Sequence, residues 1–288
     1  MITAIAGVLV GHWTDTAART GCTVVVLPPG TVASGEVRGG APATREFALL
    51  DPLRTVANVD AVVLSGGSAF GLAAGDGAVR WLEEQGRGVP VVVSRVPIVV
   101  GMSLFDLAVG DPTVRPDADA GYQACVDANA GEVPLGLVGA GTGATIGKWR
   151  GWGAARPGGL VGALRRHDDL VVACLVAVNA LGDPLDGSAP GVEVADLVSA
   201  GWLDGTSPAP FGNTTIGTIV TNATLTKSEC HLVAQSAHDG LARSLAPVHT
   251  ASDGDGFVAA ATGTVHAGVA AVRELAATVV AAAVRSLG

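Results

Sequence analysis

The sequence predicts an α/β protein in which helices pack outside two layered sheets. Short apolar runs bounded by turn residues alternate with segments of helical periodicity along the chain. The run 170–178 is apolar almost throughout, as is typical of a strand that is covered on both faces. No composition break, low-complexity tract or internal repeat divides the 288 residues, so we expect a single domain over 1–288.

In the first half of the chain, turn residues mark the limits of the predicted elements. A helix is expected over 69–85, because Leu72, Val79 and Leu82 recur at helical spacing and Gly86 follows as a stop. The Gly-, Pro- and Asp-rich passage 110–121 predicts an exposed connection. The strands expected here are 23–27, 61–65, 89–94 and 135–138.

The last quarter of the chain has the clearest pattern. A β-branched run predicts a strand over 214–222, and 257–261 predicts another. Thr226 and Glu229 form a capping-box pattern that should begin a helix. A final helix is expected from the spacing of its apolar face, which consists of Val269, Val272, Ala276, Val279 and Ala283.

Composition excludes several classes of function. Hydrophobic residues make up 49% of the chain and charged residues 15%, with 41 glycines, which indicates an ordered globule with extensive burial, including burial between subunits. The net charge of −9 and the lack of a basic cluster beyond Arg165-Arg166 argue against nucleic-acid binding.

The cysteines and the N-terminus indicate a cytoplasmic protein. Four scattered cysteines form neither a disulfide framework nor a zinc-ligand set, which fits a reducing compartment. The N-terminus lacks the basic flank and clean apolar core of a signal peptide. The most membrane-like segment, 265–284, holds Arg273 and Glu274 at its centre, so we interpret it as a soluble helix and expect no membrane contact.

Two glycine-rich segments resemble known motifs but fail the spacing rules. In 139–148, Thr142 and Trp149 stand where a P-loop needs Gly and Ser or Thr, so a turn with close backbone approach is the simpler interpretation. Ser68 lies in a segment that resembles a nucleophile elbow, but Phe70 replaces the second glycine, and we expect Ser68 to cap the following helix. The six histidines lack metal-ligand spacing, so we expect neither a cofactor nor a metal.

The segment Gly212–Val220 suggests a nucleophile. Thr214 directly precedes the β-branched run, and cleavage after Asn213 would give it a free α-amino group. An adjacent amine, with a reference pKa of about 7.7–8.0, is one of the few local groups able to activate a hydroxyl. Taken alone, Asn213-Thr214 is more simply interpreted as an ordinary turn that enters a strand.

Five segments in order resemble one enzyme family over nearly the whole chain. They are Val37–Glu46, Leu64–Leu72, Val96–Val99, Gly141–Lys148 and Gly212–Ile216. On these motifs the chain resembles the N-terminal-nucleophile hydrolases that include the DmpA-type aminopeptidases and the nylon-oligomer (6-aminohexanoate-oligomer) hydrolases.

This resemblance implies a four-layer αββα sandwich of the DmpA and ornithine acetyltransferase type, which is autoprocessed. Thr214 would attack the Asn213 carbonyl, and an acyl shift followed by ester hydrolysis would yield fragments 1–213 and 214–288. The two fragments would stay associated and form a larger homo-oligomer, a tetramer of heterodimers.

The resemblance also implies the roles of four further side chains. Lys148 matches a lysine of the nylon-oligomer branch, where an ammonium can lower the pKa of the hydroxyl or stabilise negative charge. Asn179 matches the oxyanion-hole asparagine, and Asp253 and Asp255 match a two-aspartate form that orients the Thr214 amine or binds a substrate amine. The alternatives are a solvated surface lysine, an Asn that caps a turn, and a D-G-D-G turn.

One position departs from the family pattern, and several functions remain open. Several members carry a tyrosine near the site where this chain has Phe105, which removes one hydroxyl donor. The leading hypothesis is a self-processing amidohydrolase or peptidase acting on short peptides or on ω-amino amide oligomers through an acyl-enzyme. The alternatives are a non-catalytic oligomeric relative and an acyltransferase of the ornithine acetyltransferase type.

Overall fold

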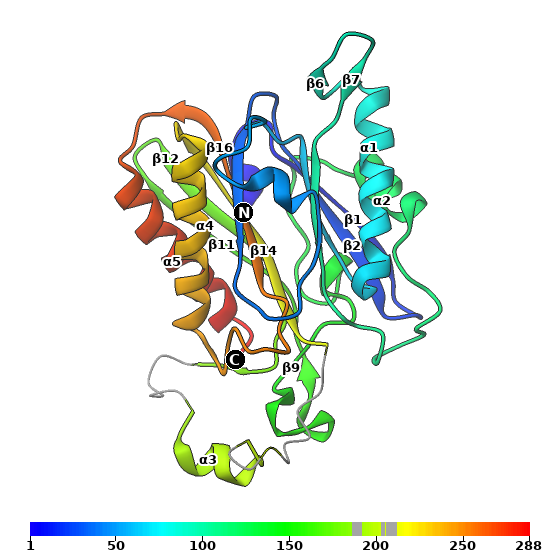
Figure 1. Cartoon of the computed structure of the whole chain (residues 1–288), viewed down its shortest axis with the longest axis vertical. Coiled ribbons are helices and arrows are strands. Elements are labelled where there is room, and N and C mark those ends of the chain that lie inside the picture. Colours follow the sequence, from blue (N-terminus) through cyan, green and yellow to red (C-terminus); the bar gives the residue numbers. More distant parts are fainter. Residues whose placement is uncertain (186–191, 203–204, 206–211) are drawn as a thin grey trace.

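The computed structural model describes residues 1–185, 192–202, 205 and 212–288. Two five-stranded sheets lie face to face, and each is covered on its outer face by a pair of helices (Figure 1). The layers therefore run helix, sheet, sheet, helix, and the predicted αββα sandwich is confirmed.

The first sheet carries most of the N-terminal motifs. Its strand order is β1 (Leu9–Asp15), β2 (Thr20–Val26), β5 (Ala61–Ser65), β8 (Val99–Ser103) and β4 (Ala43–Arg45). Only β5 and β8 pair in parallel. Helices α1 (Ala74–Glu84) and α2 (Ala118–Val126) cover its outer face.

The second sheet holds the strand that begins with Thr214. Its order is β11 (Gly159–His167), β12 (Leu170–Asn179), β14 (Thr214–Ala223), β16 (Gly256–Val265) and β3 (Val32–Val37). Helices α4 (Lys227–Ala242) and α5 (Val269–Arg285) cover it. The predicted strand 214–222, the capping box at Thr226 and the final helix are thereby confirmed.

The apolar run at 170–178 is buried on both faces because it is central in the stack. Val171, Ala173 and Leu175 pack between the sheets, whereas Val172 and Cys174 pack beneath the helices. Successive side chains of a strand point to opposite faces, so only a continuous apolar run can fill both layers.

Short elements complete the chain. The small two-stranded pairs are β6 (Val89–Pro90) with β7 (Arg95–Val96), β9 (Thr145–Ile146) with β10 (Arg156–Pro157), and β13 (Asp183–Pro184) with β15 (Leu245–Ala246). The 3-10 turns are η1 (Ile2–Ala4), η2 (Phe47–Leu50), η3 (Ser68–Ala73), η4 (Gly139–Gly141), η5 (Lys148–Arg150) and η6 (Trp152–Ala154), and α3 (Val194–Ser199) lies beyond the sandwich end.

Two predicted strands were wrong. Residues 89–94 form one arm and the tip of the exposed β6–β7 hairpin, with Val92 fully exposed, and the buried strand that follows α1 is β8 instead. Pro90 has no N–H to donate to a ladder, and an apolar run does not reveal whether anything covers it. Residues 135–138 form only an isolated bridge between Gly136 and Leu160.

Two predicted boundaries also needed correction. The connection expected over 110–121 ends early, because Asp117 accepts a hydrogen bond from the Ala120 N–H and caps α2. The helix expected from residue 69 begins as the 3-10 turn η3, and Ser68 makes no side-chain cap; it adopts a left-handed conformation with φ 54°. The glycine-rich turn at 139–148 is confirmed as a close backbone approach, since a Cβ on Gly143 would lie 2.1 Å from the Arg19 carbonyl.

Lys227 anchors the loop beside α4. Its Nζ donates to the carbonyl oxygens of Leu49, Arg54 and Val56 at 2.8, 3.0 and 2.8 Å. We expect Lys227→Met to lower the free energy of unfolding by about 2 kcal/mol, since it leaves carbonyl groups without their donor. Urea unfolding measures this change. Arg80→Met, which removes an exposed ion pair with Asp119, is the control and should change stability by less than about 1 kcal/mol.

Candidate active site

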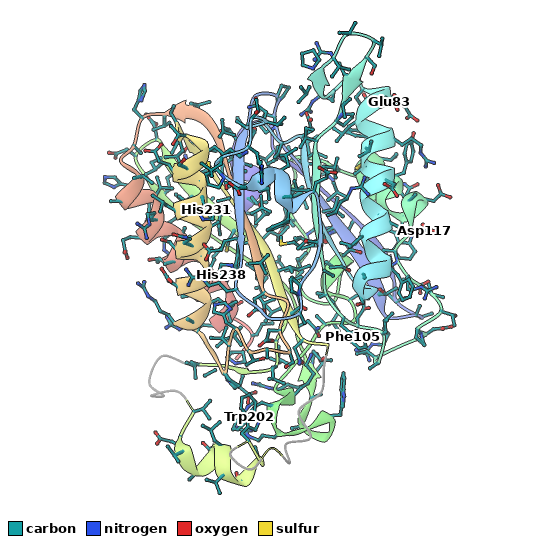
Figure 2. All side chains as sticks on the ribbon, in the orientation of Figure 1. Glu83, Phe105, Asp117, Trp202, His231 and His238 are labelled. Carbon is teal, nitrogen blue, oxygen red and sulfur yellow. The ribbon has the colours of Figure 1, made fainter. Side chains whose placement is uncertain are left out.

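The candidate site lies at the end of the sandwich where β14 begins, near Phe105 in Figure 2. Thr214 is the first residue of β14 and pairs with Asn179, the last residue of β12. A pocket of about 170 Å³ opens at this point. It is lined by Ala41, Ala43, Ser68, Ser103, Phe105, Gly212, Asn213, Thr214 and Ser252.

The peptide bond between Asn213 and Thr214 is intact and buried, with 1% and 4% of the two residues exposed. Two donors reach the Asn213 carbonyl oxygen: the Thr214 hydroxyl and the Gly254 N–H, the latter at 2.9 Å. The hydroxyl and a fixed backbone donor therefore flank the same carbonyl. This is the arrangement needed to attack a carbonyl and to stabilise the oxyanion that forms.

Gly254 fits here only because it lacks a side chain. A Cβ at this position would lie 2.7 Å from Thr214 Oγ1 and 2.8 Å from the Ala41 carbonyl oxygen. We expect Gly254→Ala to slow cleavage after Asn213 about 10²-fold, the loss typical of a displacement of about 1 Å in a reacting geometry. The fraction of intact chain against time, measured by mass spectrometry, checks this. Gly268→Ala is the control, because a Cβ there meets nothing within 4 Å.

Asn179 connects Lys148 to the residues before the nucleophile. Its Oδ1 accepts from Lys148 Nζ at 2.9 Å and from the Thr145 N–H at 2.9 Å. Its Nδ2 donates to the carbonyl oxygens of Phe105 at 2.9 Å and Gly212 at 3.3 Å. All four contacts fix the orientation of the amide, so its Nδ2 faces the segment that precedes Thr214.

Lys148 is an amine sealed inside the protein. Its residue is 0% exposed, and Nζ donates to both the backbone oxygen and Oδ1 of Asn179. Burial lowers the pKa of Lys148 to about 7, although the negative charge of Asp253 opposes the shift. Gly147, with φ 75°, provides the left-handed turn that aims the lysine inward. The alternative of a solvated surface lysine is therefore wrong.

The two aspartates are buried and hydrogen-bonded. Asp253 Oδ2 accepts from the Thr250 hydroxyl at 2.6 Å and from the Thr250 N–H at 2.8 Å. Burial, followed by the charge of Asp255, raises the pKa of Asp253 above its usual range. Asp255 Oδ1 accepts from the Thr215 N–H at 2.7 Å, and its Oδ2 accepts from His249 Nδ1 at 2.8 Å. The carboxylate of Asp255 thus reaches Thr215, the residue after Thr214.

The backbone of the Val37–Glu46 motif packs against the loop that carries the two aspartates. The N–H groups of Ala41 and Arg38 donate to the backbone oxygens of Asp253 and Asp255 at 2.8 and 3.0 Å. A Cβ on Gly39 would lie 2.3 Å from the Asp253 oxygen, which accounts for the glycine. Backbone contacts between segments more than 200 residues apart therefore position the aspartates.

Sequence reasoning missed several residues that build the site. Asp106 accepts from the Gly67 N–H and the Thr20 hydroxyl, both at 2.7 Å, and so holds the turn that leads into Ser68. Burial raises the pKa of Asp106. Thr250 and His249 were also missed. Their only signal was proximity to the D-G-D-G turn, which does not reveal what they contact.

The assembled groups are those of acyl transfer by a hydroxyl. The site joins an oxygen nucleophile, a buried amine, two buried carboxylates and donors at a carbonyl, which are the components of nucleophilic catalysis. Within the residues that the structure describes, no group of three His, Cys, Asp or Glu side chains could hold a metal ion.

Comparison with known proteins agrees with this chemistry. Residues 1–287 match the model of peptidase family S58. The chain belongs to peptidase family S58. An uncharacterised aminopeptidase of Mycobacterium leprae is 44% identical over 92% of this chain and 79% of its own length. A 6-aminohexanoate-oligomer endohydrolase of an Agromyces species is 29% identical over 84% of this chain and 69% of its own.

Solved structures share the fold. A Burkholderia β-aminopeptidase superposes with a TM-score of 0.72 at 25% identity, over 99% of this chain and 84% of that one. The L-aminopeptidase D-Ala-esterase/amidase of Ochrobactrum anthropi, described as a variant of the Ntn-hydrolase fold, gives 0.74 at 19% identity, with the same coverage. The S58 chain described here is an amide-bond hydrolase with this fold, as its sequence motifs predicted. Among its described residues, no helix is long and apolar enough to cross a membrane.

Proposed function

We propose that the chain is a self-processing amidohydrolase whose nucleophile is Thr214. The observation that carries this proposal is the buried Asn213 carbonyl, flanked by the Thr214 hydroxyl and the Gly254 N–H. The hydroxyl oxygen attacks the carbonyl carbon, the C–N bond breaks, and the Thr214 nitrogen takes a proton to become a free amine. Water then hydrolyses the resulting ester and releases the carboxylate of Asn213.

Lys148 is the base in this first reaction. Before cleavage Thr214 has no free amine, so the proton of its hydroxyl must go elsewhere. A lysine whose pKa lies at about 7 is largely neutral at slightly alkaline pH and then has a lone pair. Its two hydrogen bonds to Asn179 use both N–H groups of the neutral amine and leave that lone pair free to accept.

After cleavage, the new α-amino group becomes the base for turnover. Thr214 then attacks an external amide, forms an acyl-enzyme and releases it to water. The two fragments, 1–213 and 214–288, stay together because β14 lies between β12 of the first fragment and β16 of the second. We expect the fragment pair to assemble into a tetramer of heterodimers.

The uncut segment supports a choice between the two substrate classes. Gly212 and Asn213 occupy the place that the acyl part of a substrate must take, because nucleophile and backbone donor are the same in both reactions. In the uncut chain, the Asn213 N–H donates to the Ser252 carbonyl oxygen at 3.4 Å. The α-nitrogen of an α-aminoacyl substrate would take the place of this N–H. A linear ω-aminoacyl group has a carbon atom in that place and cannot make the hydrogen bond. The pocket therefore favours short peptides or α-aminoacyl amides with small side chains.

Two measurements on purified protein test this proposal. Denaturing mass spectrometry should find two fragments that meet at Asn213 and Thr214. The cleaved protein should hydrolyse L-alanyl-p-nitroanilide up to about tenfold more efficiently than 6-aminohexanoyl-p-nitroanilide, since one lost hydrogen bond is worth about 0.5–1.5 kcal/mol and 1.4 kcal/mol corresponds to about tenfold. A chain that stays intact and inactive would indicate a non-catalytic relative. Faster transfer to an added amine than to water would indicate an acyltransferase.

A further inference from the structure

A histidine outside the family motifs lies directly behind Asp255. Both the Nδ1 and the backbone N–H of His249 donate to Asp255 Oδ2, at 2.8 and 3.2 Å. The side chain is only 15% exposed, and the backbone is left-handed, with φ 55°. A residue other than glycine adopts this conformation rarely, and histidine is among those that tolerate it best.

Both ring nitrogens of His249 face hydrogen-bond acceptors. Nδ1 faces a carboxylate oxygen of Asp255, and Nε2 lies 3.5 Å from the backbone oxygen of His238. The His238 oxygen belongs to the last turns of α4, so the ring lies between this helix and the loop that carries Asp255.

Through Asp255, this histidine controls the start of β14. The parallel ladder between β14 and β16 begins only at Ile216. The N–H of Thr215 instead donates to Asp255 Oδ1 at 2.7 Å. Once the chain is cut before Thr214, the new N-terminus is no longer bonded to Asn213. The hydrogen bond from the Thr215 N–H to the Asp255 carboxylate then holds the residue next to that terminus in place.

Other titratable groups lie near His249 and Asp255 on the elements that pack against them. Burial lowers the pKa of His238 to about 4, so this ring, edge-on to His249 at 4.9 Å, is neutral. Its Nε2 lies 3.0 Å from the Glu36 backbone oxygen, which fixes the ring. The other titratable groups around the pair are Glu36 on β3, Arg38 just after β3, Asp239 on α4 and Asp253 in the same loop, which in turn interacts with Lys148 of η5.

We propose that His249 is a positioning residue for the amide hydrolysis, in which its ring and its backbone N–H fix the Asp255 carboxylate against Thr215. This inference rests on the proposed function of Thr214. His249 does not touch the reacting atoms. It fixes the Asp255 carboxylate, and that carboxylate accepts a hydrogen bond from Thr215, the residue after Thr214.

The test compares His249→Asn with the unaltered chain. Asparagine tolerates the left-handed backbone and keeps a neutral donor, but it removes the imidazole ring that contacts Asp255. We expect kcat/KM and the rate of self-cleavage to fall about tenfold or more, in line with loss of positioning. The acid limb of the pH profile should move upward, because a carboxylate that loses a hydrogen-bond donor takes up a proton more readily. His249→Leu, which removes the side-chain donor altogether, should be slower still.

His231→Asn provides a matched control on the same helix layer. His231 Nδ1 lies 3.1 Å from the Gly35 oxygen, and the residue stands above His238 on α4 in Figure 2, so both rates and the pH profile should stay unchanged. A His249→Asn protein that loses thermal stability while its pH profile does not move would overturn the inference. Unchanged rates would do the same. An unaltered chain that neither cuts itself nor hydrolyses amides would refute the proposed function, and this inference would fail with it.

Discussion

Thr214→Ala is expected to remain at full length and to hydrolyse no amide. The substitution removes the hydroxyl that contacts the Asn213 carbonyl oxygen, while the Gly254 donor stays in place. Loss of a nucleophile typically costs on the order of 10⁴-fold or more in rate. Mass spectrometry of the denatured protein over several days, together with p-nitroanilide hydrolysis, measures both losses.

Thr214→Ser is the matched control for this prediction. Serine keeps the hydroxyl and removes one methyl group, so the chain should still be cut at the same bond. Normal cleavage of Thr214→Ala would show that another group, or a contaminating protease, cuts the chain. That outcome would refute Thr214 as the nucleophile.

Lys148→Met is expected to separate activity from stability. Self-cleavage should slow by about 10²–10⁴-fold, the usual contribution of a general base. The free energy of unfolding should change by less than about 2 kcal/mol, because removing the cost of enclosing an amine offsets the loss of its two hydrogen bonds to Asn179. Cleavage kinetics and urea unfolding on the same preparation measure the two effects.

The pH dependence of the unaltered chain gives a second check on Lys148. Its pKa lies at about 7 in the folded protein, against about 10.4 in an unfolded chain. Between these values the unfolded state binds more protons, so this group makes stability rise with pH across that window. Self-cleavage should rise as pH increases through about 7. In Lys148→Met, neither stability nor the rate of self-cleavage should rise with pH in this way. A Met variant that kept both pH dependences would contradict the assignment of Lys148 as the base.

Local sequence patterns predicted elements correctly wherever contacts between residues close in the sequence determine the structure. The capping box at Thr226, the β-branched run from Thr214 and the run 170–178 each reflect short-range geometry, and each appeared within about two residues of its expected limits. The run 89–94 has similar composition, yet it forms an exposed hairpin. Whether an apolar strand is covered depends on elements far along the chain, which no local window contains.

By itself, the amino-acid sequence determined the layered fold and the family, because glycine spacing and ordered motifs depend on residue type. Tertiary structure alone decided how the candidate site residues meet. It buried Lys148 completely, which lowers its pKa, and it directed Asp255 toward Thr215 and His249. It also brought Gly254 against the Asn213 carbonyl. Burial and charge proximity arise from contacts between distant segments, so only the folded chain defines them.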